Sequence, residues 1–267
     1  MKQKRAYDYK YEDLDIVYGV PLYEGKPVTG VVAYYKNGTQ EYEWQYVDGM
    51  HNGIDKAYYE DGTLKYEWQY VNDEQNGINN YYYKNGVLAF EGFCKKGERE
   101  GLFKAYLLDG SLHREGQYIK GKLEGLVKVY YESGALKEEN LYKKGKKNEI
   151  CKYYYENGTV RFETQYLHGK LNGEQKVYNE DGSLYATVIC KLGKIEGGIL
   201  ADGSKMTKAQ YGKLKREEKI YYEDGELRAT VVCKLGNIIE SGIWTSDGSE
   251  MTKKAITAAM YNWNELL

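Results

Sequence analysis

Hydrophobic and polar residues along this chain repeat with a period of 24 residues. Each unit begins with about seven residues rich in tyrosine, then an Asn-Gly or Asp-Gly type turn, about eleven further residues and a second glycine turn. Such dipeptides between alternating segments predict β-hairpins, and a fixed period of this length predicts an array of stacked units. The units open at Gly53, Gly77, Gly101, Gly125, Glu149 and Gly173, and a slightly shorter one opens at Gly30.

This pattern predicts an all-β fold, an elongated single-layer twisted antiparallel sheet built from 24-residue hairpin repeats. We expect an N-terminal cap with a partial repeat in residues 1–29, and seven hairpin repeats in residues 30–196. Beyond them the period changes, so residues 197–267 are expected to form two longer, divergent repeats with short helices. An apolar stripe at helical spacing after Thr252 predicts a C-terminal capping helix, the alternative being a free helix that binds a partner.

Four columns of mostly apolar residues recur at fixed places in the units. In the unit that opens at Gly101 they are Leu102, Tyr106, Leu112 and Tyr118. A two-residue first turn would place the first and last pairs of columns on opposite faces, whereas a three-residue turn with a glycine bulge would place all four together. We favour the bulged turn, because a sheet with one buried face should collect its apolar positions there. The four columns are then the expected packing face.

Glutamates and lysines form two further columns. Successive glutamates should lie about 9 to 10 Å apart, which is too far for two carboxyls to share a proton. The lysines would oppose the glutamates only in the two-residue register, and we interpret both columns as a solvated face with weak ion pairs. The glutamates are Glu43, Glu67, Glu91, Glu115, Glu139 and Glu163, and the lysines are Lys56, Lys104, Lys128, Lys152 and Lys176.

Charge and hydropathy narrow the range of partners and locations. With 38 basic and 40 acidic side chains, the formal net charge of -2 gives no reason to expect nucleic-acid binding. Membrane lipid is not favoured either, since its binding would need a local basic patch. No run approaches the roughly 18 apolar residues of a membrane span, and the N-terminus has no apolar signal core. We therefore expect a cytoplasmic protein, or a secreted or surface-exposed one if a leader has been removed.

The sequence contains no recurrent catalytic, metal or cofactor motif. His51, His113 and His168 occupy different positions in their units, and the four cysteines have neither zinc-binding nor redox spacing. An active site is a unique constellation, whereas these units differ mainly by ordinary surface variation. We expect a non-enzymatic protein that needs no cofactor.

Tyrosine dominates the aromatic residues, with 31 copies against 4 phenylalanines and 4 tryptophans. Because tyrosine is a favoured anchor at protein interfaces, we predict that a row of these rings binds a protein partner. The competing interpretation, which we favour, is that the rings are structural. We also expect the protein to be a monomer. The candidate residues are Tyr58, Tyr82, Tyr106, Tyr130, Tyr154, Trp44 and Trp68.

The repeat resembles a known family. Glu115-Gly116-Gln117-Tyr118, followed by Lys120-Gly121-Lys122 and Gly125, resembles the Y-E-G-x-W-x-x-G-x-x-x-G pattern of MORN repeats. The Tyr-Tyr-x-Asn-Gly-x-Leu form at residues 82–88 is similar to MORN-variant repeats of bacterial proteins, although Asp73 and Glu149 stand at glycine positions. The resemblance implies a twisted sheet with a groove and an antitoxin-like role in a toxin-antitoxin pair. It implies two alternatives, an exported interaction protein of a host-associated bacterium and a scaffold that binds membrane phospholipid.

Overall fold

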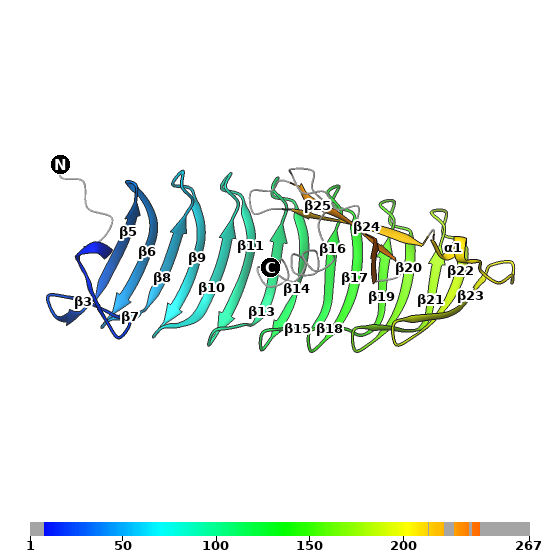
Figure 1. The fold of residues 1–267 in the computed structure, drawn as a ribbon, viewed down its shortest axis with the longest axis horizontal. Coiled ribbons are helices and arrows are strands. Elements are labelled where there is room, and N and C mark those ends of the chain that lie inside the picture. Colours follow the sequence, from blue (N-terminus) through cyan, green and yellow to red (C-terminus); the bar gives the residue numbers. More distant parts are fainter. Residues whose placement is uncertain (1–7, 213, 222–226, 235–236, 241–267) are drawn as a thin grey trace. The chain divides into compact units, whose positions relative to one another are not determined.

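The structure is a computed structural model that describes residues 8–212, 214–221, 227–234 and 237–240. It divides into two compact units. Unit 1 takes residues up to 110 together with residues 118–122, and unit 2 takes residues 111–117 and those from 123 onward. Both units consist of hairpins laid side by side in a twisted, mostly antiparallel sheet (Figure 1). The predicted fold class is therefore confirmed.

The main sheet of unit 1 follows the order of the chain, and β5, β6, β8, β9, β10, β11 and β13 are its principal strands. Strand β1 pairs with β5 in parallel, and β2, β3 and β4 form a separate small sheet. The elements are β1 (Tyr9–Lys10), η1 (Tyr11–Asp13), β2 (Asp15–Val17), β3 (Val20–Tyr23), β4 (Lys26–Pro27), β5 (Gly30–Lys36), β6 (Thr39–Val47), β7 (Met50–His51), β8 (Gly53–Tyr58), β9 (Leu64–Val71), β10 (Glu74–Tyr82), β11 (Leu88–Lys95), β12 (Glu98–Arg99) and β13 (Gly101–Tyr106).

Unit 2 continues the same hairpin design and adds a short helix and a second small sheet made of β24, β25 and β26. Strands β14 (Leu112–Ile119) and β15 (Lys122–Leu123) have residues in both units. The helix expected after Thr252 lies outside the described residues. The elements of unit 2 are β16 (Gly125–Tyr130), β17 (Leu136–Lys143), β18 (Lys146–Lys147), β19 (Glu149–Tyr154), β20 (Val160–Leu167), β21 (Lys170–Tyr178), β22 (Leu184–Lys191), β23 (Lys194–Leu200), α1 (Lys208–Gly212), β24 (Lys215–Tyr221), β25 (Leu227–Lys234) and β26 (Asn237–Glu240).

The first turns at Gly62, Gly86, Gly134, Gly158 and Gly182 are the bulged turns that the sequence favours, whereas the hairpin of β5 and β6 has a two-residue turn with Lys36 opposite Thr39. In the hairpin of β10 and β11, Tyr83 N donates to Val87 O and Gly86 N donates to Tyr83 O, both at 2.8 Å. Gly86 has a φ of +83°, the left-handed conformation that a glycine bulge requires. The same two hydrogen bonds close the turns at Gly62, Gly134, Gly158 and Gly182.

A second bulge follows directly in these bulged-turn hairpins and overturns the predicted packing face. Tyr82 lies opposite Leu88, but Tyr81 lies opposite Phe90, so Ala89 is an extra residue. One extra residue moves every later side chain of that strand to the other face. The prediction that Leu102, Tyr106, Leu112 and Tyr118 share one packing face is therefore wrong.

The extra residue of the second bulge differs from hairpin to hairpin. In several hairpins it is a lysine or arginine whose charged group lies over the ring of a tyrosine. Lys65 Nζ lies 5.5 Å from the ring centre of Tyr59, and Lys137 Nζ lies 5.6 Å from that of Tyr131. Such cation–π contacts are worth about 0.5 to 1 kcal/mol at exposed sites. In these hairpins, the charged side chain of the bulge therefore packs on the tyrosine that precedes the turn.

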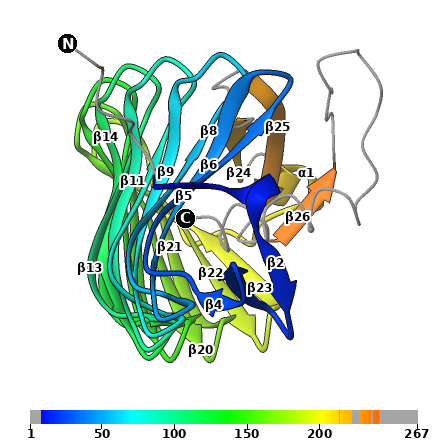
Figure 2. The same ribbon diagram turned by 90° about the vertical axis from the view of Figure 1, so that its left-hand side faces the viewer.

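We call the face that carries Phe90 and Phe103 the inner face, and the face that carries Tyr82 and Leu102 the outer face. The inner face holds the buried side chains of unit 1, including Phe90, Cys94, Phe103 and Tyr118. Strand β13 shows the contrast most sharply, because Leu102 is 77% exposed whereas the next residue, Phe103, is 2% exposed. The strands that carry these faces are curved along their length (Figure 2).

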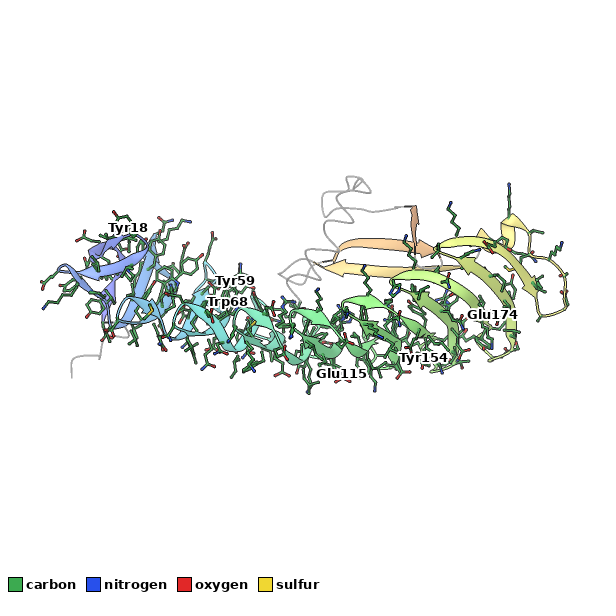
Figure 3. All side chains as sticks on the ribbon, turned by 90° about the horizontal axis from the view of Figure 1, so that it is seen from below. Tyr18, Tyr59, Trp68, Glu115, Tyr154 and Glu174 are labelled. Carbon is green, nitrogen blue, oxygen red and sulfur yellow. The ribbon has the colours of Figure 1, made fainter. Side chains whose placement is uncertain are left out.

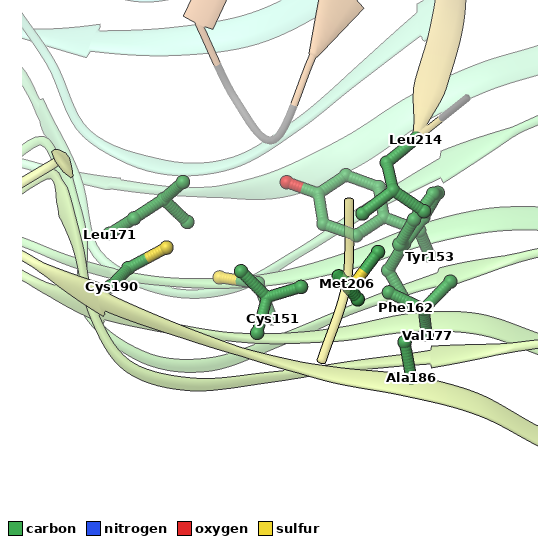
Figure 4. Close-up of a cluster of buried hydrophobic side chains, with 10 residues drawn as sticks. Cys151, Tyr153, Phe162, Leu171, Val177, Ala186, Cys190, Met206 and Leu214 are labelled. Atoms are coloured by element: carbon green, nitrogen blue, oxygen red, sulfur yellow. The ribbon is translucent and has the colours of Figure 1, made fainter. Parts of the chain in front are cut away.

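Unit 2 buries its inner face under the segment that follows β23. Met206 and Leu214 from that segment pack on side chains of β19 to β22 (Figure 4), and Tyr211 packs against the same cluster. The sheet contributes apolar residues of different sizes to this cluster: Cys151, Tyr153, Phe162, Leu171, Val177, Ala186, Val188 and Cys190. Cys94, Cys151 and Cys190 are buried and free, as expected for small apolar packing residues.

Backbone and side-chain hydrogen bonds join each hairpin to its neighbours. In the second turns, the glycine N–H donates to a carbonyl of the preceding repeat, as from Gly121 to Arg99 at 2.9 Å. In the other direction, the hydroxyl of Tyr83 donates to Tyr106 O at 2.8 Å, and the hydroxyl of Tyr131 donates to Tyr154 O at 2.6 Å. The second tyrosine of each Tyr-Tyr pair is therefore a link between repeats.

Two adjacent residues of β13 test which face is the core. Replacing Phe103 with Ala should lower the free energy of unfolding by about 3 to 5 kcal/mol, because it removes a buried ring. Replacing Leu102 with Ala should change it by less than about 0.5 kcal/mol, because that side chain is exposed. Urea denaturation of both variants measures the difference. A larger loss for Leu102→Ala than for Phe103→Ala would contradict the inner-face assignment.

Candidate functional site

The tyrosines predicted to bind a partner lie on the outer face, and the hydroxyls of four of them, and of Tyr178, donate to the glutamate column. Each of these hydroxyls reaches the glutamate of the preceding repeat, 15 residues earlier in the chain. The bonds are 3.0 Å for Tyr82 to Glu67, 2.5 Å for Tyr106 to Glu91, 2.7 Å for Tyr130 to Glu115, 2.6 Å for Tyr154 to Glu139 and 3.1 Å for Tyr178 to Glu163. In unit 2, Glu115, Tyr154 and Glu174 are on the same side of the sheet (Figure 3).

The lysine column lies beside these glutamates. Lys56 is opposite Glu67 in the strand register, so the prediction that the two columns oppose each other only with a two-residue turn is wrong. The second bulge is the reason, because it restores the pairing that the first bulge would have shifted. The nitrogen–oxygen distances are 3.9 Å for Lys56 to Glu43 and to Glu67, 3.9 Å for Lys104 to Glu91 and 3.5 Å for Lys152 to Glu163. Such exposed pairs contribute little to stability.

The two tryptophans of the candidate set lie on the inner face, opposite in direction to the tyrosine column. Trp44 stacks on Tyr42 with ring centres 5.2 Å apart, and Trp68 stacks on Tyr66 with ring centres 4.0 Å apart. Both pairs come from the identical strand sequence Tyr-Glu-Trp-Gln-Tyr-Val in β6 and β9. The structure therefore divides the seven candidate residues between two faces, and Figure 3 shows where Trp68 stands in unit 1.

A polar cluster that the sequence pattern did not predict lies on the inner face of unit 1. The Asp55 carboxylate lies 2.6 Å from His51 Nδ1, and the Tyr46 hydroxyl lies 3.0 Å from His51 Nε2. Asp55 also accepts a hydrogen bond from Gln45 N at 3.0 Å, so its burial is compensated. His51 and Asp55 are four residues apart in the sequence, which is a local signal. Tyr46 comes beside His51 only because β6 pairs with β7.

Exposed apolar side chains gather in a stripe on the outer face of unit 1. They come from successive strands, on the second-turn side of the tyrosine and glutamate columns. Each is between 39% and 77% exposed, and Leu102 is the most exposed of them. We call this set the apolar stripe: Val47, Ile54, Val71, Ile78, Phe93, Leu102 and Ile119. Contiguous apolar surface of this kind is typical of interaction sites.

Exposed lysines gather on the second turns of unit 2. None of them forms an ion pair within the described part of the unit, whereas Lys56, Lys104 and Lys152 of the outer face are paired. An exposed leucine stands among them, since Leu192 is 59% exposed with a φ of +48°. We call this set the basic edge: Lys143, Lys144, Lys146, Lys170, Lys191 and Lys194. The small net charge of the whole chain gives no indication of this basic edge.

Metal-ligating side chains do not gather in the described residues. No cluster of three His, Cys, Asp or Glu side chains there could hold a metal ion. No helix in the same part of the chain is long and apolar enough to cross a membrane. The geometry thus defines a class of protein, a β-hairpin repeat array with extended surfaces.

Four stretches of the chain match the model of the MORN repeat variant. They are residues 52–72, 123–144, 150–168 and 171–188. The first stretch lies in unit 1 and contains Trp68, and the other three lie in unit 2. No curated protein matches the chain. The resemblance inferred from the turn pattern is thus supported at the level of the repeat.

The tyrosine–glutamate bonds predict a loss of stability at high pH. Burial, followed by the hydrogen bond to Glu115, raises the pKa of Tyr130 to about 12, from an ordinary value of 10.0. The folded protein therefore holds this proton more tightly than the unfolded chain. Its stabilising contribution should be complete below pH 10 and should be lost as the pH rises through about 12.

Urea denaturation between pH 9 and pH 11.5 measures this effect. The free energy of unfolding should fall with pH less steeply for Tyr130→Phe than for the wild type. Tyr18→Phe, which removes a fully exposed hydroxyl, is the control and should follow the wild type. Equal slopes for Tyr130→Phe and the wild type would contradict the assignment.

Proposed function

We propose that this chain is a non-enzymatic protein-binding module and that the apolar stripe of unit 1 is its binding surface. MORN repeats are generally binding modules for proteins or lipids rather than enzymes. The observation that carries the proposal is the exposure of seven apolar side chains on one face of one sheet. The tyrosine column is a weaker candidate, since its hydroxyls already bond to glutamates.

Within this function we propose an antitoxin-like role, in which the partner is a toxin that the stripe covers. The resemblance to bacterial MORN-variant repeats supports this choice, and a cytoplasmic location accompanies it. The alternative is an exported protein that meets host components. A small toxin gene beside the gene for this chain would favour the first role, and a signal sequence upstream of Met1 would favour the second.

Site-specific photo-crosslinking in the source cell tests the proposal. Benzoylphenylalanine at position 102 should capture one protein partner, because Leu102 is the most exposed side chain of the stripe. The same probe at position 184 in unit 2, where Leu184 is 40% exposed, is the matched control and should capture little. A second substitution, Ile78→Asp, should reduce capture at position 102 at least tenfold. Capture that is equal at both positions, or insensitive to Ile78→Asp, would overturn the proposal.

The basic edge of unit 2 favours a second candidate function, binding to anionic phospholipid. Six exposed lysines on three successive turns would attract such a surface, each contributing about 1 kcal/mol near the membrane. Leu192 would enter the headgroup region, which accounts for a large apolar side chain at an exposed left-handed position.

Sedimentation with vesicles separates this candidate from protein binding. The wild type should sediment with vesicles of 30% phosphatidylserine in 50 mM salt, and Lys144→Glu with Lys170→Glu and Lys194→Glu should reduce the bound fraction at least fivefold. Lys56→Glu, in a paired lysine on the outer face of unit 1, is the control and should bind as the wild type does. A wild type that stays in the supernatant at 50 mM salt would exclude the lipid candidate.

A further inference from the structure

The spacing of the apolar stripe points to the kind of partner segment that it accepts. The stripe takes one side chain from each successive strand, from Val47 in β6 to Ile119 in β14. Neighbouring strands lie about 4.8 Å apart, so these six intervals extend over about 29 Å. The members do not stand in one straight row, because Ile54 lies opposite Gln69, two residues from Val71, whereas Ile78 lies opposite Phe93. Measured across the strands, a partner that follows the stripe must still present an apolar side chain about every 4.8 Å.

An amphipathic helix meets this spacing better than an extended strand does. Apolar residues at the a and d positions of a helix recur on average every 3.5 residues, which is about 5.2 Å at 1.5 Å per residue. A strand presents one face every second residue, about 6.7 Å apart. Over six intervals the helix drifts from the stripe by less than about 3 Å, whereas the strand drifts by about 11 Å. A helix of about 20 residues therefore fits the whole length.

A second copy of this chain fits less well than a helix. The apolar side chains of the stripe expose on the order of 500 Å², the upper range for one patch on a monomer. Two such stripes face to face would bury about 1,000 Å², less than the 1,200 to 2,000 Å² of a stable interface. A narrow partner such as a helix can use the same surface and place polar contacts along both sides of it.

Charges along the second turns give the partner helix a direction. At the β11 to β15 end, Lys95, Lys96, Lys120 and Lys122 are exposed, and they make no ion pair within the described residues. Three carboxylates lie on or beside these turns: Glu98 opposite Lys95, Glu100, which accepts a hydrogen bond from Lys120 N at 2.8 Å, and Glu124 after β15, so the four lysines outnumber them. The turns at the other end carry Asp48, Asp73 and Glu74 instead. A helix that is acidic at one end would therefore dock with that end over the lysines.

We propose that the apolar stripe binds an amphipathic α-helix of the partner protein, with the acidic end of that helix over Lys95, Lys96, Lys120 and Lys122. This inference rests on the proposed function and adds the chemistry of the partner segment. Leu102, the sixth of the seven residues, is the most exposed side chain of the stripe, and the register of β11 and β13 brings it beside Phe93. The negative end of the helix dipole adds to the attraction if the acidic end is the C-terminus.

Fluorescence anisotropy with the full chain and a defined probe tests this proposal. The probe is a labelled 21-residue peptide with Leu at every a and d position, Glu in its last two turns and Gln elsewhere. It should bind saturably, and Leu102→Asp should weaken binding at least tenfold. Lys120→Glu with Lys122→Glu should weaken it at least fivefold. Ile16→Asp, which changes an exposed apolar residue of the small sheet, should leave binding unchanged.

Two further peptides separate specific docking from general stickiness. A peptide of the same composition with leucines at alternate positions should bind at least tenfold more weakly, and so should a peptide with Lys in place of Glu. Equal binding of the three peptides, or no loss with Leu102→Asp, would overturn the helix proposal. If the probe fails while crosslinking at position 102 still captures a partner, the partner class is wrong and the proposed function stands. If crosslinking fails as well, both fall.

Discussion

The second bulge of each hairpin controls which side chains meet water. The glycine bulge of the turn joins Tyr82 and Leu88 on one face, and the extra residue after the leucine sends the rest of the strand to the other. If Ala89 paired regularly with Tyr81 instead of bulging, Phe90 and Cys94 would face outward and the inner face would lose its rings. The tyrosine–glutamate bonds, the lysine pairs and the apolar stripe all depend on the same displacement.

The sequence predicted the array well, because glycine turns are local features with a fixed chemical cause. Positive φ at Asp73 and Glu149 shows that even the two departures keep the backbone of the glycines they replace. The faces of the sheet were predicted less well. The extra residues at this place in the described hairpins include Glu41, Lys65, Ala89, Lys137, Arg161, Tyr185 and Arg228, which share no property of size or charge. Because this bulge requires no particular residue type, its position cannot be predicted from the sequence.

The candidate surfaces show a similar limit. The rows of tyrosine, glutamate and lysine were visible, yet the bond from Tyr106 to Glu91 depends on contacts between neighbouring repeats. Leu102 was assigned to the core because it belongs to an apolar column, and exposure overturned that assignment. Likewise, the net charge of -2 describes the whole chain and does not indicate that lysines gather on the second turns. The basic edge is seen only when the hairpins lie side by side and their turns are aligned.

The links between repeats have a consequence for folding. The backbone bond from Gly121 reaches back 22 residues to Arg99, and the hydroxyl bond from Tyr83 reaches forward 23 residues to Tyr106. Folding of the array therefore closes only short loops, whose entropic cost is small and does not grow with the number of repeats. A gene can gain or lose a whole 24-residue repeat, and so lengthen or shorten these surfaces, without slowing the folding of the remaining hairpins.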